Sequence, residues 1–359
     1  MDTKIVRYIL CRMLGVEAAL LLVPVLVAVI YQEKCGIVFL IPIVILCLLF
    51  WVVGRKRPEH GQIYGKEGMV IVALAWILWS LFGAMPFTLS GYIPSYVDAF
   101  FETVSGFTTT GSSIIPDVEV LPHCLLFWRS FTHWIGGMGV LVFVLVVTSL
   151  DRKNSMHLMR AEVPGPEKDK LVPKAMSTAR ILYGMYLTLT VIEMVFLVIG
   201  GMNLFDSMIF SFGSAGTGGF SNYADSVAHF NSAYIDGVIT VFCALFGVNF
   251  ALFYFMILGD FKSVLKNEEL RTYILLIAGA TAAIMLNIHS LYPTIGKSFR
   301  YAVFQVVTVI TTTGYSTADF AQWPMFSKAV LMMLTVIGAC ASSVSYTHLR
   351  AHETGAYLV

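Results

Sequence analysis

Three short polar segments of this sequence share a glycine, hydroxyl side chains and one pattern. They are VSGFTTTGSS (104–113), SFGSAGTGGFS (211–221) and VITTTGYS (309–316). The segments align on Gly111, Gly219 and Gly314, and each glycine is followed by one residue and then by Ser. Repetition of a motif along a chain usually reflects one structural unit that is used several times.

The residue types in these segments suit a dehydrated monovalent cation. Backbone carbonyls, helped by Thr and Ser hydroxyls, can replace the water shell of such an ion without adding fixed charge. A glycine permits the positive φ angle that turns successive carbonyls toward one axis. A short helix that ends at the segment would aim its partly negative C-terminus at the same point. One copy alone would also fit a flexible loop, but three copies favour a cation filter.

The composition requires a membrane. Of the 359 residues, 57% are hydrophobic and 13% charged, and the mean hydropathy is +0.79, which is typical of an integral membrane protein. Eight apolar runs are long enough to cross a hydrocarbon core of about 30 Å. They lie at about 8–30, 36–54, 68–89, 124–150, 177–200, 234–258, 272–290 and 325–343. We therefore expect an all-α polytopic membrane protein.

Each polar segment lies between two of these runs and follows an apolar stretch too short to cross, at 96–107, 204–213 and 299–310. The sequence thus predicts repeated units of helix, pore half-helix, filter loop and helix. The predicted domains are an N-terminal helical pair (1–66), repeat 1 (67–150), a cytoplasmic loop with repeat 2 (151–258), repeat 3 (259–343) and a tail (344–359). Polar backbone at membrane depth is tolerated where it lines a water-filled path.

Charge distribution predicts the orientation. Most of the 23 Lys and Arg lie in the N-terminus and in 55–66, 151–180 and 259–271, which places these parts and the N-terminus in the cytoplasm. The filter loops then enter from outside, where the connections carry Asp98, Glu102, Asp117, Glu119, Asp206, Asp225, Asp236 and Asp319. These acids could form a mouth that concentrates cations, or be ordinary solvated loop acids. The recurrence of Asp98 and Asp206 before their glycines favours the mouth.

Ionisable residues inside a span are functional-site hypotheses by default. Arg129 and His133 lie one turn apart, but their flanking Trp128 and Trp134 favour a structural anchor that braces the pore loop. Glu193 must face protein, pair or be protonated, which leaves proton coupling and a buried hydrogen bond as alternatives.

Four motifs resemble those of the bacterial potassium-uptake proteins of the TrkH, TrkG and KtrB type, which are related to plant and fungal Trk and HKT transporters. They are ETVSGFTTTGSS (102–113), FWRSFTHWIGGMGVLV (127–142), SAGTGGFS (214–221) and VVTVITTTGYST (306–317). The resemblance runs from about residue 5 to Ser343, and the extra N-terminal pair is closer to TrkH than to KtrB. It implies the pore-forming subunit of a potassium-uptake system, with coupling to H⁺ or Na⁺ left open.

The resemblance also implies a setting: the bacterial inner membrane, a homodimer and a cytosolic nucleotide-binding ring subunit of the TrkA or KtrA type. K⁺ would be the transported ion, with no covalent cofactor and no nucleic-acid partner. The sequence holds no Walker motif and no HExxH, so we do not expect an enzyme. The alternative class, a polytopic membrane enzyme or non-conducting binding protein, would require clustered acid, base or nucleophile residues at one depth.

Carried over by position, the resemblance assigns the filter to Thr109, Thr110, Gly111, Thr217, Gly218, Gly219, Thr312, Thr313 and Gly314. K⁺ would bind at Thr110, Gly111, Gly218, Gly219, Thr313 and Gly314. In the family a glycine in the first repeat is associated with potassium selectivity, whereas Ser accompanies sodium transport in some plant members. Part of a gate loop would lie at Gly338, Ala339, Cys340, Ala341 and Ser342.

The number of repeats departs from the family, which builds each pore from four. Only three are found here, and the tail 344–359 has no apolar span and does not resemble membrane protein. We expect a chain truncated within repeat 3, with a foreign tail; a natural short form is the alternative. Three repeats cannot enclose a four-walled filter, so activity would require a partner that supplies the fourth wall, or be absent.

Overall fold

The computed structural model describes residues 3–54, 65–137, 139 and 175–338, which form helices and no strands. Two compact units make up the chain. Unit 1 comprises Met1–Thr108 and Ser112–Arg180, and unit 2 comprises Thr109–Gly111 and Ile181–Val359. The first filter segment therefore belongs to unit 2, although the residues on either side of it belong to unit 1.

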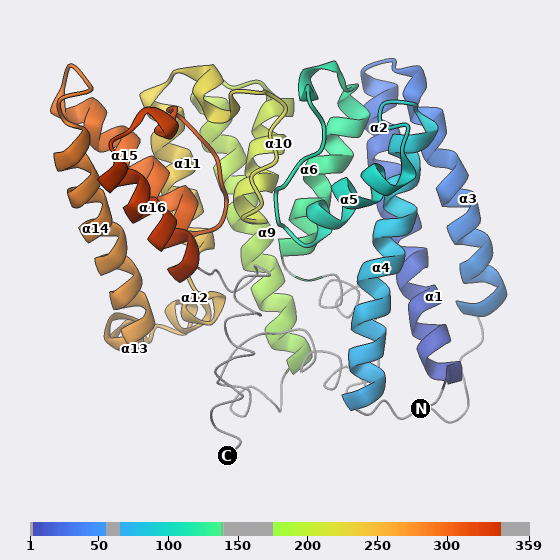
Figure 1. Ribbon diagram of the computed structural model, residues 1–359. Coiled ribbons are helices and arrows are strands. Elements are labelled where there is room, and N and C mark those ends of the chain that lie inside the picture. Colours follow the sequence, from blue (N-terminus) through green and yellow to red (C-terminus); the bar gives the residue numbers. More distant parts are fainter. Residues whose placement is uncertain (1–2, 55–64, 138, 140–174, 339–359) are drawn as a thin grey trace. The chain divides into compact units, whose positions relative to one another are not determined.

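Unit 1 holds the N-terminal helices and the first repeat (Figure 1). Its elements are α1 (Thr3–Leu20), α2 (Leu22–Ile30), η1 (Lys34–Phe39), α3 (Leu40–Leu49), η2 (Phe50–Gly54), α4 (Gly65–Leu89), α5 (Tyr96–Phe107), η3 (Val118–Val120) and α6 (His123–Gly137). The stretches Thr3–Ile30, Lys34–Gly54 and Glu67–Leu89 are long and apolar enough to cross a membrane. The first three predicted crossings are thus confirmed as helical spans.

Unit 2 holds the second and third repeats. Its elements are α9 (Ala175–Ile199, of which unit 2 holds the part from Ile181), α10 (Leu204–Ala215), η5 (Ser226–Phe230), α11 (Ala233–Phe246), α12 (Phe250–Ile257), α13 (Phe261–Lys266), α14 (Glu268–Ile288), α15 (Ile295–Ile310), η6 (Phe320–Gln322) and α16 (Met325–Ile337). Ile181–Ile199 and Glu268–Ile288 are long enough to cross, whereas α11 and α16 are shorter apolar helices. The predicted crossings at 124–150 and 325–343 continue outside the described residues.

The run predicted to cross at 234–258 is divided in the structure, where α11 ends at Phe246 and α12 begins at Phe250. At the break, the Val248 amide donates to the Leu245 carbonyl instead of to Ala244. The hydroxyl of Tyr273, on α14, donates to the Ala244 carbonyl at 3.2 Å and so satisfies a group that the ended helix leaves open. Helix α11 can therefore end within an apolar run without leaving the Ala244 carbonyl unpaired.

The three pore half-helices are confirmed as α5, α10 and α15. Each has a polar N-cap whose side chain accepts a hydrogen bond from the amide three residues on: Ser95 from Asp98, Asn203 from Asp206, and Thr294 from Lys297. N-caps of this kind satisfy the open amides of the first turn, and an acid there also complements the helix dipole. The recurrence of Asp98 and Asp206 therefore reflects helix capping.

Glu33, between α2 and η1, caps the N-terminus of α6. Its carboxylate accepts from the backbone amides of His123 at 2.8 Å and Cys124 at 3.0 Å, and contacts Nδ1 of His123 at 2.9 Å. The Tyr31 ring stacks on His123 with centroids 4.0 Å apart. Burial raises the pKa of Glu33, but these hydrogen bonds outweigh it, so that its pKa lies below the ordinary value. The loop after α2 is thereby tied to the helix that follows the first filter segment.

Replacement of Glu33 by Gln should destabilise the protein by about 1 kcal/mol at neutral pH, the usual value of a helix cap. Because the folded-state pKa of Glu33 is lowered, its contribution is fully present above the unfolded-state pKa and disappears as pH falls through the folded-state pKa. Thermal unfolding in detergent, from pH 7 into the acid range, should show wild type and variant converging. Glu119→Gln, at an exposed position, is the control; a gap that persists in acid would contradict the capping role.

Candidate functional site

The three glycine segments lie in the same compact unit. Thr109–Gly111, Thr217–Gly219 and Thr312–Gly314 all belong to unit 2. Within that unit, α10 ends at Ala215 and α15 at Ile310, so each of these half-helices ends shortly before its segment. The nine residues assigned to the filter from sequence therefore lie within one compact unit.

Each segment contains two residues in the left-handed backbone region. The glycines Gly111, Gly219 and Gly314 have φ angles of 75°, 72° and 80°. The threonines two places earlier, Thr109, Thr217 and Thr312, also have positive φ, at 55°, 53° and 59°. A β-branched residue rarely adopts this region, and each such residue costs about 1–3 kcal/mol. The same strained backbone thus recurs at the same place in all three repeats.

The residues between them, Thr110, Gly218 and Thr313, do not have positive φ. The backbone handedness therefore alternates along each segment. Alternation of this kind points successive carbonyl groups to one side of the chain, which is the arrangement that a dehydrated cation requires. The sequence predicted left-handed glycines; it gave no signal for left-handed threonines, because residue preference opposes them.

The glycine of one segment lies directly against a carbonyl of the next. A Cβ atom at Gly111 would overlap the carbonyl oxygen of Gly218, and one at Gly219 would overlap that of Thr313. Gly218 and Thr313 occupy the same place, immediately before the glycine of their segments. Only glycine fits at these two positions. The same contact, of a glycine with a carbonyl oxygen of the next segment, therefore joins the first segment to the second and the second to the third. Among the described residues, a Cβ at Gly314 would meet nothing within 4 Å.

Hydrogen bonds connect the second and third segments to the half-helices that precede them. The Gly219 amide lies 3.5 Å from the Gly213 carbonyl, and the Gly314 amide donates to the Thr308 carbonyl at 3.0 Å. The Thr308 hydroxyl donates to the Tyr315 carbonyl at 3.0 Å. The two amide bonds involve equivalent positions in the two repeats, so the repeated backbone has repeated support.

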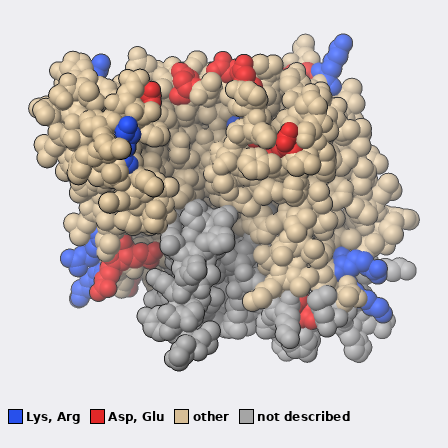
Figure 2. Space-filling model, in the orientation of Figure 1, with Lys and Arg blue, Asp and Glu red and all other residues tan. Residues whose placement is uncertain are grey.

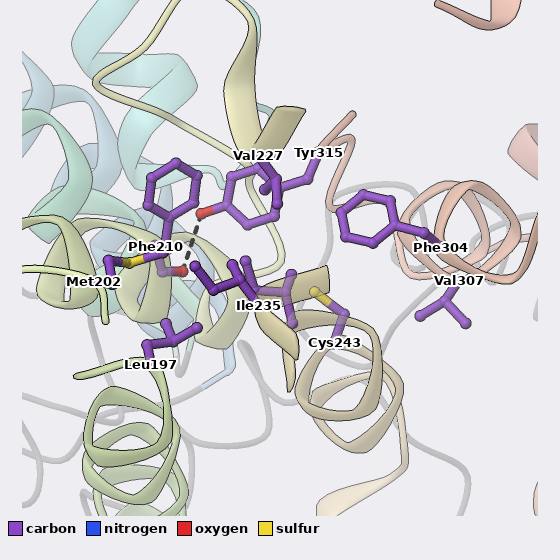
Figure 3. Close-up of a cluster of buried hydrophobic side chains, with 10 residues drawn as sticks. Leu197, Met202, Phe210, Val227, Ile235, Cys243, Phe304, Val307 and Tyr315 are labelled. Carbon is purple, nitrogen blue, oxygen red and sulfur yellow. Dashed lines mark hydrogen bonds between the residues drawn. The ribbon is translucent and has the colours of Figure 1, made fainter. Parts of the chain in front are cut away.

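Tyr315 connects the third segment to the second repeat (Figure 3). Its side chain is fully buried, and its hydroxyl donates to the Phe210 carbonyl at 3.0 Å and lies 3.4 Å from the Phe220 carbonyl. Gly213 makes room, since a Cβ there would overlap the Tyr315 hydroxyl. Around it packs a cluster of buried residues: Leu197, Met202, Phe210, Val227, Ile235, Ile239, Cys243, Phe304 and Val307.

The first repeat is braced by a buried ion pair inside unit 1. Arg129 on α6 donates from Nε to Oε1 of Glu102 on α5 at 2.6 Å, and both side chains are almost completely buried. Glu102 also accepts from the Ser113 hydroxyl at 3.0 Å and from the Ile114 amide at 2.9 Å. Arg129 thus acts through Glu102 on the chain that leaves the first segment, in agreement with the anchor interpretation.

The acidic mouth is wrong for three of its proposed members, Glu102, Asp206 and Asp236, which are buried and paired. Asp206 accepts from Nδ2 of Asn222 at 2.6 Å and from the Tyr223 hydroxyl at 2.9 Å, and Asp236 accepts from Nε of Arg300 at 2.6 Å. A carboxylate buried at this depth is stable only with such partners. These groups hold helices and loops together and present no open charge.

Glu193 and the first predicted gate residue, Gly338, are both buried. Glu193 on α9 is completely buried with Ser214 of α10 beside it, so it faces protein as expected. Of the gate residues only Gly338 is described: a Cβ there would lie 2.6 Å from the Ile310 carbonyl oxygen, at the end of α15. Ala339, Cys340, Ala341 and Ser342 lie outside the described residues.

Comparison with known proteins gives consistent matches. The family model described as "TrkH: Cation transport protein" matches residues 37–350. The Trk system potassium uptake protein TrkH of Escherichia coli K12 is 35% identical over 334 residues, covering 90% of this chain and 68% of that protein. TrkG of the same organism is 32% identical over 328 residues, covering 90% of this chain and 68% of that protein. The crystal structure of the potassium transporter TrkH from Vibrio parahaemolyticus superposes with a TM-score of 0.83 at 29% identity, covering 99% of this chain and 75% of that one.

Glu102→Gln should destabilise unit 1 strongly, because it leaves the buried guanidinium of Arg129 without its carboxylate. Breaking a buried ion pair from one side costs about 3–5 kcal/mol. Denaturant unfolding in detergent measures the loss. Asp98→Asn, one turn earlier on α5 and only half-buried, is the matched control and should cost far less. Equal stabilities of Glu102→Gln and wild type would show that the ion pair between Glu102 and Arg129 does not stabilise unit 1.

Tyr315→Phe should leave the Phe210 carbonyl without its buried donor, at a cost of about 1–3 kcal/mol. The shift in thermal midpoint should be accompanied by faster amide exchange at Gly314, whose segment Tyr315 ties to the second repeat. Tyr234→Phe removes a hydroxyl from a half-exposed ring and serves as control. Unchanged exchange at Gly314 in the Phe variant would show that the hydroxyl does not hold the segment.

Proposed function

The chain belongs to the TrkH family of cation transport proteins, and from this membership and the site we propose that it is the pore-forming membrane subunit of a potassium-uptake system. One observation carries the proposal: three segments share one alternating backbone, and each of the first two glycines lies against a carbonyl of the next segment. An arrangement built from backbone carbonyls, with no fixed charge, suits a monovalent cation.

We propose that the filter consists of the nine residues assigned from sequence, with K⁺ held by carbonyls of Thr110, Gly111, Gly218, Gly219, Thr313 and Gly314. The half-helices α10 and α15 end at this filter, so their partly negative C-termini favour a cation there. The ion would move inward down the membrane potential, which contributes about 2.3 kcal/mol per unit charge per 100 mV. This driving force needs no enzymatic step in the chain, in keeping with relatives named as uptake proteins.

A fourth segment is proposed to lie against Gly314. A Cβ at Gly314 meets nothing within 4 Å among the described residues, whereas Gly111 and Gly219 each abut a neighbouring segment. A fourth segment of the same kind would continue the repeating contact and separate the ion from lipid on that side. Its source would be a further part of the polypeptide or a partner.

The proposed location is the bacterial inner membrane, with the N-terminus in the cytoplasm. Lys4 and Arg7 lie at the start of α1, and Lys262, Lys266 and Arg271 lie on α13 and the start of α14. Figure 2 shows blue side chains gathered over these helix ends. Excess Lys and Arg marks cytoplasmic connections. We further propose a homodimer that binds a cytosolic ring subunit of the TrkA or KtrA type, on the family resemblance.

Gly111→Ser and Gly219→Ser should each lower the preference for K⁺ over Na⁺ by tenfold or more, which corresponds to about 1.4 kcal/mol. The reason is steric: the new side chain must displace the carbonyl of Gly218 or Thr313. K⁺ and Na⁺ fluxes are measured in liposomes that contain the protein. Gly279→Ser, on α14 with open space around it, is the matched control. Unaltered selectivity in both filter variants would refute the assignment.

A further inference from the structure

Two cysteines that are far apart in the sequence have neighbouring thiols in unit 1. Cys35 lies at the start of η1, and Cys124 lies in the first turn of α6. The Cys124 thiol donates a hydrogen bond to the sulfur of Cys35, and both cysteines are free thiols. This contact places the two atoms that a disulfide would join next to each other, on two separate elements.

The backbone on both sides of Cys35 is fixed against its surroundings. On the N-terminal side, the Glu33 carboxylate accepts from the Cys124 amide at 3.0 Å, and the Glu33 amide donates to the Ala28 carbonyl at 2.8 Å. On the C-terminal side, Gly36 is buried, and a Cβ there would lie 2.5 Å from the Cβ of Ala28 on α2. Because α2 also packs against α6, the packing of the helices holds the two thiols together.

The two thiols differ in exposure. Cys124 is completely buried, whereas Cys35 is half-buried next to the exposed Lys34. Lys34 and Cys35 are the first two residues of the apolar stretch Lys34–Gly54, so Cys35 lies at one end of a membrane span. A dissolved reagent can therefore reach Cys35 but not Cys124. In the orientation proposed above, this end is outside the cytoplasm, where disulfides form and persist.

We propose that Cys35 and Cys124 are a redox pair, which a dissolved disulfide compound converts into an intramolecular disulfide. Cys35 gives its proton to solvent and attacks one sulfur of the oxidant, so that a mixed disulfide forms and the first thiol of the oxidant leaves. Cys124 then loses its proton and attacks the sulfur of Cys35, which expels the second thiol. The oxidant accepts two electrons, and each thiol that leaves it takes up one proton. A thiol reductant reverses both steps.

The disulfide would reinforce the attachment that the Glu33 cap already makes. It would join the start of the second span to α6, which carries Arg129. The ion pair of Arg129 with Glu102 supports the chain that leaves the first filter segment. A cross-link stabilises a protein chiefly by restricting its unfolded chain, and Cys35 and Cys124 enclose a long loop of about 90 residues. Oxidation should therefore stabilise the support of the first repeat.

The test is peptide mass spectrometry of the purified full chain in detergent. The protein is reduced with dithiothreitol, freed of reductant, incubated with oxidised glutathione and then alkylated with N-ethylmaleimide in denaturant. Digestion should give one cross-linked pair of peptides, which contain Cys35 and Cys124 and which dithiothreitol separates. The oxidised protein should unfold at a temperature about 5 °C above that of the reduced protein.

Single variants distinguish the pair from unspecific oxidation. Cys124→Ser should stop at the mixed disulfide of Cys35 with glutathione, because no second thiol can attack it. Cys35→Ser should leave Cys124 free of glutathione, because Cys124 is buried. Neither variant should gain unfolding temperature on oxidation. Cys47→Ser, which removes an exposed cysteine of α3, is the matched control and should keep both the cross-link and the gain.

Three results would overturn the proposal. They are alkylation of both Cys35 and Cys124 in oxidised wild type, a link from Cys35 to a different cysteine, and a complete link that leaves the unfolding temperature unchanged. The wild-type measurement needs no variant to fold, and it depends neither on the proposed orientation nor on ion transport.

Discussion

The backbone of the filter segments adopts a conformation that an isolated chain disfavours, and much of the surrounding structure holds it in place. Thr109, Thr217 and Thr312 are left-handed although they are β-branched. Three such residues represent several kcal/mol of strain, at about 1–3 kcal/mol each. Strain of this size persists only where neighbouring groups fix the chain on both sides. The half-helices before the segments and the braces after them meet that requirement.

The braces differ between repeats although the backbone they support is the same. When the repeats are aligned on their glycines, Glu102 corresponds to Phe210 and Gln305. In the first repeat a buried carboxylate with Arg129 holds the chain that leaves the segment. In the third, Tyr315 reaches across to the carbonyl of Phe210. The equivalent positions therefore act differently: Glu102 accepts hydrogen bonds with its side-chain carboxylate, and Phe210 accepts one with its backbone carbonyl. This is possible because a backbone group can form its hydrogen bond with any well-placed partner.

The sequence predicted features that depend on local pattern. The half-helices appear where a short apolar run precedes a polar segment; α5 has the predicted bounds, and α10 and α15 differ from theirs by a few residues. Features that depend on distant partners could not be predicted. The break before Phe250 lies in an apolar run and is satisfied by Tyr273, which follows much later in the chain. Asp206 recurs at the same distance before its glycine as Asp98, and this pattern in the sequence predicts an acidic mouth. The sequence does not indicate that Asn222 and Tyr223 donate hydrogen bonds to the Asp206 carboxylate.

The contact between segments gives the filter glycines a second role beside backbone freedom. A positive φ alone could be met by another residue, as the three threonines demonstrate. Gly111 and Gly219 are restricted further, because a side chain there would enter the space of a carbonyl in the next segment. That carbonyl is one of the groups proposed to hold the ion. A substitution in one segment therefore alters two walls, which links the identity of a single glycine to the ion preference of the whole filter.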